Sequence, residues 1–249
     1  PVLSGLNAMP TLREDDAAPA GLDVAALVAG QIADGDAGAQ TGLAVVAAGT
    51  TGGRWQFSTD SGANWSDMGN VSPAAARLLA ADASTRLRFL PAADWNGSSA
   101  ALEVRAWDRT GGTAGQIFGD TSTSGGTTPF SASTAAVSVT VTAVNDAPVR
   151  SGSLPGPLSV TQGAAAQAFG LAGLSYGPGG GADEAQQTLS YTVVDLPSAG
   201  LGTVFLADGT TAEVSGTSYT LTQLQGLRFD ASAGTDAGSG RLAWTVQDS

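Results

Sequence analysis

The sequence predicts an all-β protein that consists of two consecutive antiparallel β-sandwich modules. Apolar and polar residues alternate with a period of two in short runs, as in Arg-Trp-Gln-Phe-Ser at 54–58, and breaks with glycine or proline separate the runs. The chain also repeats itself. Pro-Val-Leu-Ser-Gly at 1–5 returns as Pro-Val-Arg-Ser-Gly at 148–152. Leu-Arg-Phe at 87–89 returns at 227–229, so the sequence contains two copies of one module.

We expect the boundary between the modules after Ala147, which gives modules at 1–147 and 148–249. The tetrapeptide Asn-Asp-Ala-Pro at 145–148 marks this boundary, because the second Pro-Val-x-Ser-Gly string starts on its proline. Each copy is long enough to bury a core of its own.

The second module is expected to lack its last strand. Asp108 and Asp248 are equivalent in the repeat, and the first copy continues beyond Asp108 into a strand-like run at 136–144. The sequence stops one residue after Asp248. The remaining alternating runs predict strands at 54–58, 86–90, 101–107, 188–194, 203–206, 213–214, 218–221, 227–229 and 241–246.

Three short segments are expected to form helical turns. Ser72 and Pro73 have the chemistry of an N-cap and a first helical position, ahead of an apolar run at 74–79. Residues 22–27 and 222–226 are the other two, and the second of these directly precedes a Leu-Arg-Phe strand.

Composition excludes several classes of function. Lys and Arg total 10 against 22 Asp and Glu, which gives a net charge of −12 and a pI near 4.1. Without a basic surface the chain is not expected to bind nucleic acid or an anionic membrane.

The chain has no cysteine and no histidine. Disulfides, thiolate or histidine zinc sites and Ser-His-Asp catalysis are therefore excluded. The glycine-rich run at 177–181 lacks the Lys-Ser/Thr of a phosphate-binding loop. We expect no enzyme activity in this segment.

The tryptophans have two interpretations. Trp55 alternates with Phe57, and Trp244 occupies the position of Val104 in the repeat, so both are expected in the core. Trp65 and Trp95 are the candidates for exposed rings that stack on sugars.

Nine residues near the expected module ends are candidate calcium ligands: Glu14, Asp34, Asp36, Asp108, Asn145, Asp146, Asp183, Glu184 and Asp248. Calcium prefers carboxylate and carbonyl oxygens. Each residue alone is also explained as a turn former, because Asp and Asn bond neighbouring backbone amides. However, Asp108 and Asp248 end equivalent strands in both copies, which favours a shared role.

At these positions the chain resembles the cadherin-like tandem repeats of large bacterial surface adhesins, including those of repeats-in-toxin type. The string Val-Thr-Val-Thr-Ala-Val-Asn-Asp-Ala-Pro-Val at 139–149 is similar to their junction between modules, and the strings at 53–62, 87–91 and 94–97 are similar to others that recur there. The resemblance covers the first module fully and the second more loosely.

The resemblance implies seven-stranded Greek-key sandwiches with calcium between consecutive modules. One group of ligands would converge on the joint: Glu14, Asn145, Asp146, Asp183, Glu184 and Asp248. The other group would lie at the opposite pole of the first module: Asp34, Asp36 and Asp108. The chain departs from the animal cadherin pattern at Ala143, where an Asp is usual, and its linker is one residue shorter. We therefore expect fewer ions than in the animal proteins, or none.

The implied function is that of a non-catalytic extender segment of an extracellular bacterial adhesin. Its partners would be the neighbouring modules of the same chain, and calcium would stiffen the joints. Two alternatives remain: a module that binds a surface glycan or protein, and accessory domains of a secreted enzyme.

Overall fold

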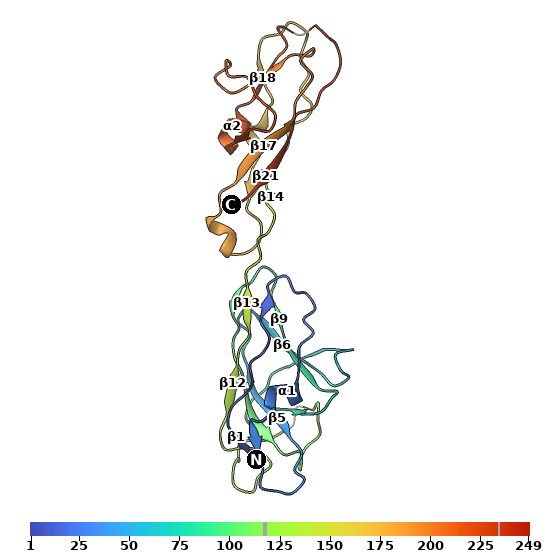
Figure 1. The fold of residues 1–249 in the computed structure, drawn as a ribbon, viewed down its shortest axis with the longest axis vertical. Helices are drawn as coiled ribbons and strands as arrows, with labels where there is room; N and C mark the ends of the chain where they lie inside the picture. The colour runs from blue at the N-terminus through green and yellow to red at the C-terminus, as the bar shows by residue number, and fades with distance from the viewer. Residues whose placement is uncertain (117–118, 234) are drawn as a thin grey trace. The chain divides into compact units, whose positions relative to one another are not determined.

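The computed structural model describes residues 1–116, 119–233 and 235–249 (Figure 1). The chain divides into two compact units, Pro1–Val144 and Asn145–Ser249, called unit 1 and unit 2 below and described separately. This division falls after Val144, three residues before the boundary that the sequence predicted after Ala147. The only α-helices in the described ranges have five residues each, so the predicted all-β class is confirmed.

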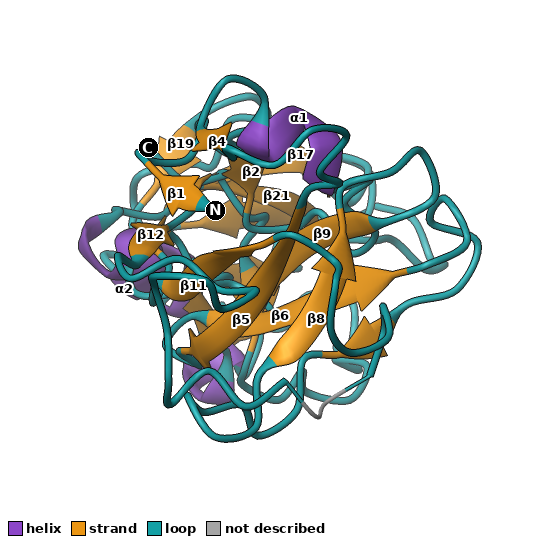
Figure 2. Ribbon diagram, turned by 90° about the horizontal axis from the view of Figure 1, so that it is seen from below, coloured by secondary structure: helices purple, strands orange, loops and turns teal. Residues whose placement is uncertain are grey.

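The elements of unit 1 are β1 (Val2–Leu3), β2 (Leu12–Arg13), β3 (Leu22–Asp23), α1 (Val24–Val28), β4 (Ile32–Ala33), β5 (Gly42–Ala48), β6 (Gly53–Ser58), β7 (Ser66–Asp67), β8 (Arg77–Ala80), β9 (Arg86–Pro91), β10 (Gly97–Ser98), β11 (Leu102–Trp107), β12 (Ala135–Val137) and β13 (Thr140–Thr142). Its two four-stranded sheets have the orders β12-β11-β5-β8 and β3-β9-β6-β7, and Figure 2 shows β5, β6, β8, β9 and β11. The smaller sheets are β1-β4 and β10-β13-β2, and in the latter β13 and β2 run parallel.

The core of unit 1 lies between its two large sheets. Trp55 and Phe89 contribute from one sheet, with ring centroids 5.3 Å apart, and Val45 and Val104 contribute from the other. Strand β5 is apolar almost throughout because it is covered on both faces. Its Leu43 and Val45 face this core, while Ala44 and Val46 belong to a second apolar cluster with Trp107.

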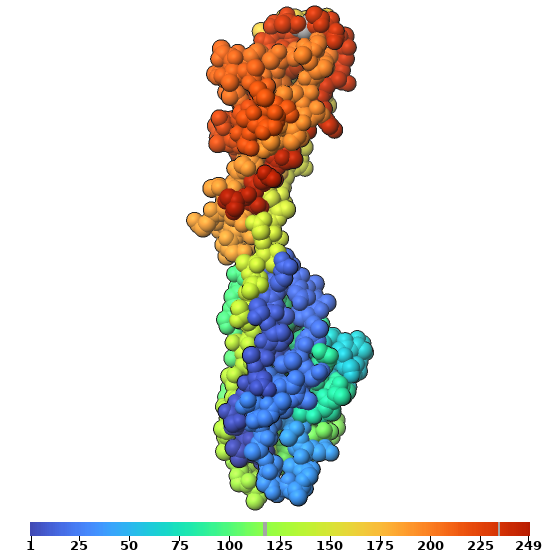
Figure 3. Space-filling view, viewed as in Figure 1, coloured from blue at the N-terminus to red at the C-terminus, as the bar shows by residue number. Residues whose placement is uncertain are grey.

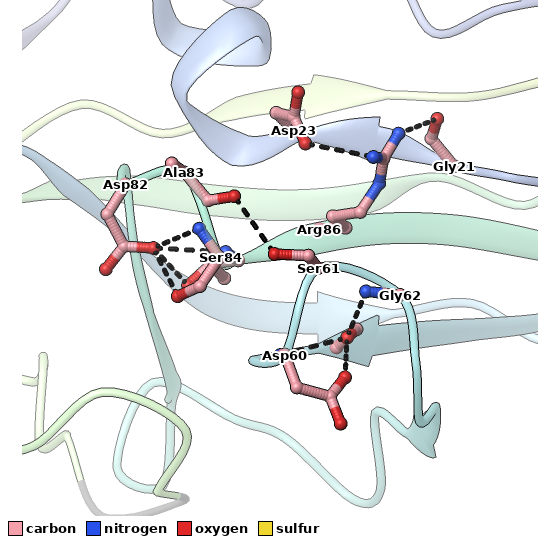
Figure 4. A network of polar contacts seen from close by, with 11 residues as sticks. Gly21, Asp23, Asp60, Ser61, Gly62, Asp82, Ala83, Ser84 and Arg86 are labelled. Atoms are coloured by element: carbon pink, nitrogen blue, oxygen red, sulfur yellow. Dashed lines mark hydrogen bonds and ion pairs between the residues drawn. The ribbon is translucent and has the colours of Figure 1, made fainter.

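A polar network holds the turns at one end of β6 and β9 (Figure 4). Asp82 Oδ1 accepts hydrogen bonds from the amides and hydroxyls of Ser84 and Thr85. Residues 59–62 form the turn after β6, and Ser61 in it has a φ of 61°. Arg86 lies 3.4 Å from Asp23 and ties β9 to β3.

The elements of unit 2 are β14 (Val149–Arg150), β15 (Gln167–Ala168), η1 (Leu171–Gly173), β16 (Tyr176–Gly177), η2 (Asp183–Gln186), β17 (Ser190–Asp195), β18 (Thr203–Phe205), β19 (Ser218–Tyr219), α2 (Leu221–Gln225), β20 (Arg228–Asp230) and β21 (Ala243–Gln247), with η for 3₁₀ helices. Its sheets have the orders β19-β17-β21, β15-β20-β18 and β14-β16.

The strand order of unit 2 repeats part of that of unit 1. The series β8-β5-β11 corresponds to β19-β17-β21, and β3-β9-β6 corresponds to β15-β20-β18. Gly53 and Gly202 show the same correspondence in detail. A Cβ on Gly53 would lie 2.2 Å from a carbonyl oxygen and 2.8 Å from the Phe89 ring, and a Cβ on Gly202 would lie 2.3 Å from a carbonyl oxygen and 2.9 Å from the Phe229 ring.

Two of the three predicted helical turns are present. The turn predicted at 22–27 is present as α1, which begins two residues later and ends at Val28. The turn predicted at 222–226 is present as α2, which begins with a capping box between Thr220 and Gln223. The helix predicted at 74–79 is wrong, because Arg77–Ala80 is strand β8 and pairs with β5. Burial of Leu78 and Leu79 in the sheet outweighs the local N-cap pattern. The strand predicted at 213–214 is also absent.

Candidate metal centre

The nine predicted ligands lie in three places. Glu14 follows β2 in unit 1, and Asp34, Asp36 and Asp108 line a hollow of unit 1. The remaining residues belong to unit 2: Asn145, Asp146, Asp183, Glu184 and Asp248.

In unit 2 the first residues are tied to both η2 and the end of β21. Asn145 Nδ2 donates to Asp248 Oδ1 at 3.2 Å, and Gln187 Nε2 donates to Asn145 Oδ1 at 2.8 Å. The amide of Asp146 lies 3.4 Å from Glu184 Oε1. The structure therefore brings Asn145, Asp146, Glu184 and Asp248 together, and we call this set the acidic end of unit 2.

Two buried carboxylate oxygens in the acidic end lack donors. Glu184 is 2% exposed, and its Oε2 atom has no hydrogen-bond partner in the described part of the chain. The same holds for Asp248 Oδ2, which is also inaccessible to solvent. Buried acceptors without a donor are rare and destabilising, and a cation that binds between them is one common explanation.

The electrostatics of Glu184 agree with this geometry. Burial is the largest cause that raises the pKa of its carboxyl above the ordinary value, and the hydrogen bond from the Asp146 amide opposes the shift. The nearby charges of Asp183, Asp146 and Asp248 raise this pKa further. A bound cation would remove both the desolvation and the repulsion of the negative charge.

Glycine makes room for the acidic end. Gly180 has a φ of 42°, and a Cβ there would lie 2.3 Å from Asp146 Oδ2 and 2.8 Å from Glu184 Cγ. Sequence reasoning excluded the run at 177–181 as a phosphate-binding loop and gave it no part in a metal site. It also missed Gln187, whose amide orients Asn145. Neither residue type signals a metal site by itself.

The oxygen atoms of the acidic end are suitable ligands for calcium. They are carboxylate oxygens on three separate chain segments, with an amide carbonyl beside them and neither nitrogen nor sulfur ligands. Calcium accepts such all-oxygen, irregular sets. Asp183 is adjacent in η2 and half-buried, and it contributes negative charge to the same place.

Glu14 has a structural role within unit 1. It is 3% exposed, its Oε1 accepts from the Val144 amide at 2.6 Å, and its Oε2 accepts from Asn96 Nδ2 at 3.0 Å. The carboxylate thus fastens the segment after β13 to the turn before β10. Two acidic residues that were not among the predicted ligands, Asp15 and Asp94, lie near each other there, with carboxylate oxygens within 4.8 Å.

The hollow of unit 1 has a volume of about 420 Å³ and is lined by Asp34, Asp36 and Asp108. Asp34 Oδ2 lies 3.3 Å from the amino group of Pro1, and Oδ1 accepts from the Asp36 amide. That amide hydrogen bond is the main cause that lowers the pKa of Asp34. Asp108 Oδ1 accepts both the amide and the hydroxyl of Thr110. Asp34 and Asp108 therefore each accept hydrogen bonds within unit 1.

The tryptophans do not form an open aromatic platform. Trp55 is buried, as predicted, but Trp244 is only half-buried. Trp95 contacts Phe89 edge-on at 6.4 Å, and the Arg88 guanidinium lies 4.1 Å from the centre of the Trp65 ring. Both candidate stacking rings are thus engaged within unit 1.

Comparisons with known proteins do not extend this picture. No protein-family model matches the chain, and a search of curated proteins finds no match. Among the described residues, no helix is both long enough and apolar enough to cross a membrane.

Proposed function

We propose that the chain is a non-catalytic extender segment of a large bacterial surface adhesin, and that unit 2 binds calcium at its acidic end. One observation carries the calcium part. Two carboxylates, Glu184 and Asp248, each bury an oxygen that accepts no hydrogen bond in the described residues. The adhesin part rests on the resemblance of 139–149 and the other quoted strings to cadherin-like repeats.

The role of the ion would be mechanical. Calcium supplies positive charge, while the residues of the chain position the oxygens. Asn145 and Asp146 begin the unit, and Asp248 lies near its end, so a site that includes them would fix the entering chain against β21 and η2. An ion that binds only the folded state also raises stability by mass action, by about 2.7 kcal/mol at 100 times Kd.

Thermal unfolding of the full chain in calcium and in EDTA tests this proposal, with magnesium as a control. We expect calcium to raise the melting temperature, and isothermal titration to show saturable binding that Glu184→Gln weakens. If calcium changes neither the melting temperature nor the heat of titration, the calcium part is wrong. Small-angle scattering with and without calcium then tests whether the ion stiffens the chain, as an extender requires.

The glycan-binding alternative is less well supported, because the half-buried rings of Trp65 and Trp95 already contact Arg88 and Phe89 within unit 1. A cell-surface location remains part of the proposal, and secretion of the parent protein with surface labelling of intact cells would test it.

A further inference from the structure

A second hollow of unit 1 lies beside β7 and β8, the edge strands of its two large sheets, and has a volume of about 640 Å³. Ser66 of β7 and Arg77 of β8 both line it, together with Phe57, Thr59, the turn after β8 and the segment 114–116. Figure 3 shows the cyan residues around β7 at the surface of unit 1. We call this feature the β7–β8 hollow. Its size is within the range of small-molecule binding sites.

Hydrogen bonds hold the walls of the β7–β8 hollow in place. The Leu78 amide of β8 donates to the Gln116 carbonyl at 3.0 Å, and the Gly115 amide donates to the Leu78 carbonyl at 2.7 Å. The turn after β8 is held by the hydrogen bonds that Asp82 accepts, and Figure 4 shows this turn. A ligand would therefore not have to order the walls, which lowers the entropic cost of binding.

Arg77 brings a positive charge to the β7–β8 hollow. Its Nη1 donates to the Gly115 carbonyl at 2.8 Å, its Nη2 donates to the Met68 carbonyl at 3.1 Å, and its guanidinium carbon lies 4.5 Å from the centre of the Phe57 ring. No ion pair joins Arg77 to a carboxylate in the described part of the chain. Burial lowers the pKa of its guanidinium, because the charged form loses water. Each Nη carries two hydrogens, so each keeps one donor for an anionic ligand.

The other groups that line the β7–β8 hollow are mostly polar. The Asp82 side chain is 38% exposed, and its Oδ2 lies 4.0 Å from Arg109 Nη1, which is too far for a hydrogen bond. This oxygen can accept a hydrogen bond from a ligand. The exposed hydroxyls of Thr59 and Ser66 are also part of the lining. Because Phe57 is only 7% exposed, it offers little apolar surface. Such walls suit a ligand that is rich in hydroxyl groups.

Three simpler kinds of ligand match these groups less well. A neutral sugar leaves Arg77 without an anion. A dicarboxylate places its second negative charge near Asp82, in a chain whose net charge is already −12. An α-amino acid can place its ammonium group on Asp82, but its side chain finds little apolar surface beside Phe57. A sugar with a single carboxylate matches the charge and the hydroxyl-binding groups together.

We propose that the β7–β8 hollow binds a hexuronic acid, with its carboxylate on the Arg77 guanidinium and its hydroxyl groups on Asp82 and the neighbouring hydroxyls. The site is separate from the rings of Trp65 and Trp95 and from the acidic end of unit 2. It therefore depends neither on aromatic stacking nor on calcium, and it adds recognition of an acidic glycan to the extender role.

Nitrogen-15 NMR of the full chain, titrated with sodium glucuronate, tests the proposal. The amide signals of Ser84, Thr85 and Gly115 should shift along saturating curves that share one Kd. Glucose, sodium acetate and glycine are the comparison ligands. Each should bind at least about tenfold more weakly, because each lacks either the carboxylate or the sugar hydroxyls. The proposal is overturned if glucuronate shifts no signal of the hollow, or if any comparison ligand binds as tightly as glucuronate.

Two variants locate the ligand in the hollow. Arg77→Gln should raise the glucuronate Kd by about 10- to 100-fold, the effect of losing hydrogen bonds from a charged group. Because Arg77 also holds two backbone carbonyls, this variant can lose stability. Ser66→Tyr leaves Arg77 in place and fills the hollow from the exposed strand β7, so it should abolish glucuronate binding while circular dichroism shows a folded chain.

Arg105→Gln is the matched control. Arg105 is also half-buried and donates to the carbonyl oxygens of Ser131 and Ala132, but it does not line the β7–β8 hollow. The glucuronate Kd should not change in this variant. Binding by Ser66→Tyr that equals binding by the original chain would overturn the proposal. Equal losses of affinity in Arg105→Gln and Arg77→Gln would do the same.

Discussion

The side-chain amide of Asn145 donates a hydrogen bond to the Asp248 carboxylate at 3.2 Å, and so joins the first residue of unit 2 to the end of its sheet. The other oxygen of Asp248 is buried and accepts no hydrogen bond within the described residues. Glu184 Oε2 is likewise buried and accepts none there. The acidic end is therefore held in place before any cation binds, although its negative charges repel one another.

Replacing Glu184 by Gln should have opposite effects with and without calcium. In EDTA the melting temperature should rise, because the amide removes a buried charge among other carboxylates. In calcium the Kd should rise by at least about tenfold, since even changes outside the ligand set typically cost 10- to 100-fold. Calorimetric titration and thermal unfolding measure the two effects.

Glu213→Gln is the matched control for this experiment. Glu213 is 7% exposed, and burial raises its pKa as well, but its backbone pairs with Val204 and not with the acidic end. The variant should leave the calcium Kd unchanged. Equal loss of calcium affinity in both variants would contradict the site.

Gly53→Ala and Gly202→Ala should each destabilise their own unit. Both residues have φ near 150°, and the added Cβ would overlap a backbone carbonyl. Gly209→Ala is the control, because its φ is 70° but nothing lies within 4 Å of the added Cβ. The control should show only the left-handed backbone penalty of about 1–2 kcal/mol, and the two test variants should lose more. Urea denaturation of all three variants measures the loss in the free energy of unfolding, and a loss in Gly209→Ala as large as in the other two would contradict the prediction.

Trp95→Ala should weaken the fold of unit 1. The ring packs on Phe89 and against Gly52, so its removal should lower the free energy of unfolding. Removal of a fully buried aromatic ring costs about 3–5 kcal/mol, and the loss here should not exceed that range because Trp95 is half-buried. Trp95→Phe should restore part of the loss. A glycan array on which the original chain binds a sugar and Trp95→Phe does not would instead support the alternative function.

The carboxyl of Asp60 should titrate near pH 2. The amide of Asn64 is the main cause that lowers its pKa from 3.8 to about 2, with help from the Ser58 hydroxyl and the Asn64 side chain. Because the folded state has the lower pKa, the stabilisation is complete above the unfolded value and is lost as the pH falls from 3.8 towards 2.

Carbon-13 NMR of the carboxyl groups follows this titration directly. Asn64→Ala keeps the backbone amide and removes only the side-chain donor, so it should raise the pKa of Asp60 only part of the way towards its ordinary value. Asp208, whose pKa is also lowered to about 2 but by Thr211 and Thr210, should not move in that variant. A titration of Asp60 that is unchanged in Asn64→Ala would show that this amide side chain is unimportant.

Local patterns in the sequence predicted much of the fold. Period-two alternation located the longer strands, such as β6, β9 and β11, and the position before the second Leu-Arg-Phe string located α2. These signals depend on neighbouring residues and are visible in one sequence. The segment 74–79 misled the prediction, since its helix-like start is overridden by pairing with β5, which lies far away in the chain.

The acidic end was predicted only in part for a similar reason. Carboxylates and Asn145 signal a possible site by their type. Gln187 and Gly180 contribute by position alone, one by a hydrogen bond and the other by the lack of a Cβ. Trp244 illustrates the limit for burial, because the repeat placed it in the core at the position of Val104, whereas it is half-buried and packs against the apolar cluster of unit 2.

The parallel pairing of β2 with β13 sets how unit 1 responds to force. These strands belong to the beginning and the end of the unit, so tension on its two ends pulls them in opposite directions along their length. Their mutual hydrogen bonds are then loaded in shear and must break together instead of one after another. The same holds for the bond that the Glu14 amide donates to the Thr142 carbonyl and the bond that the Val144 amide donates to the Glu14 carboxylate. Unit 1 should therefore resist stretching far better than its few residues of parallel pairing suggest.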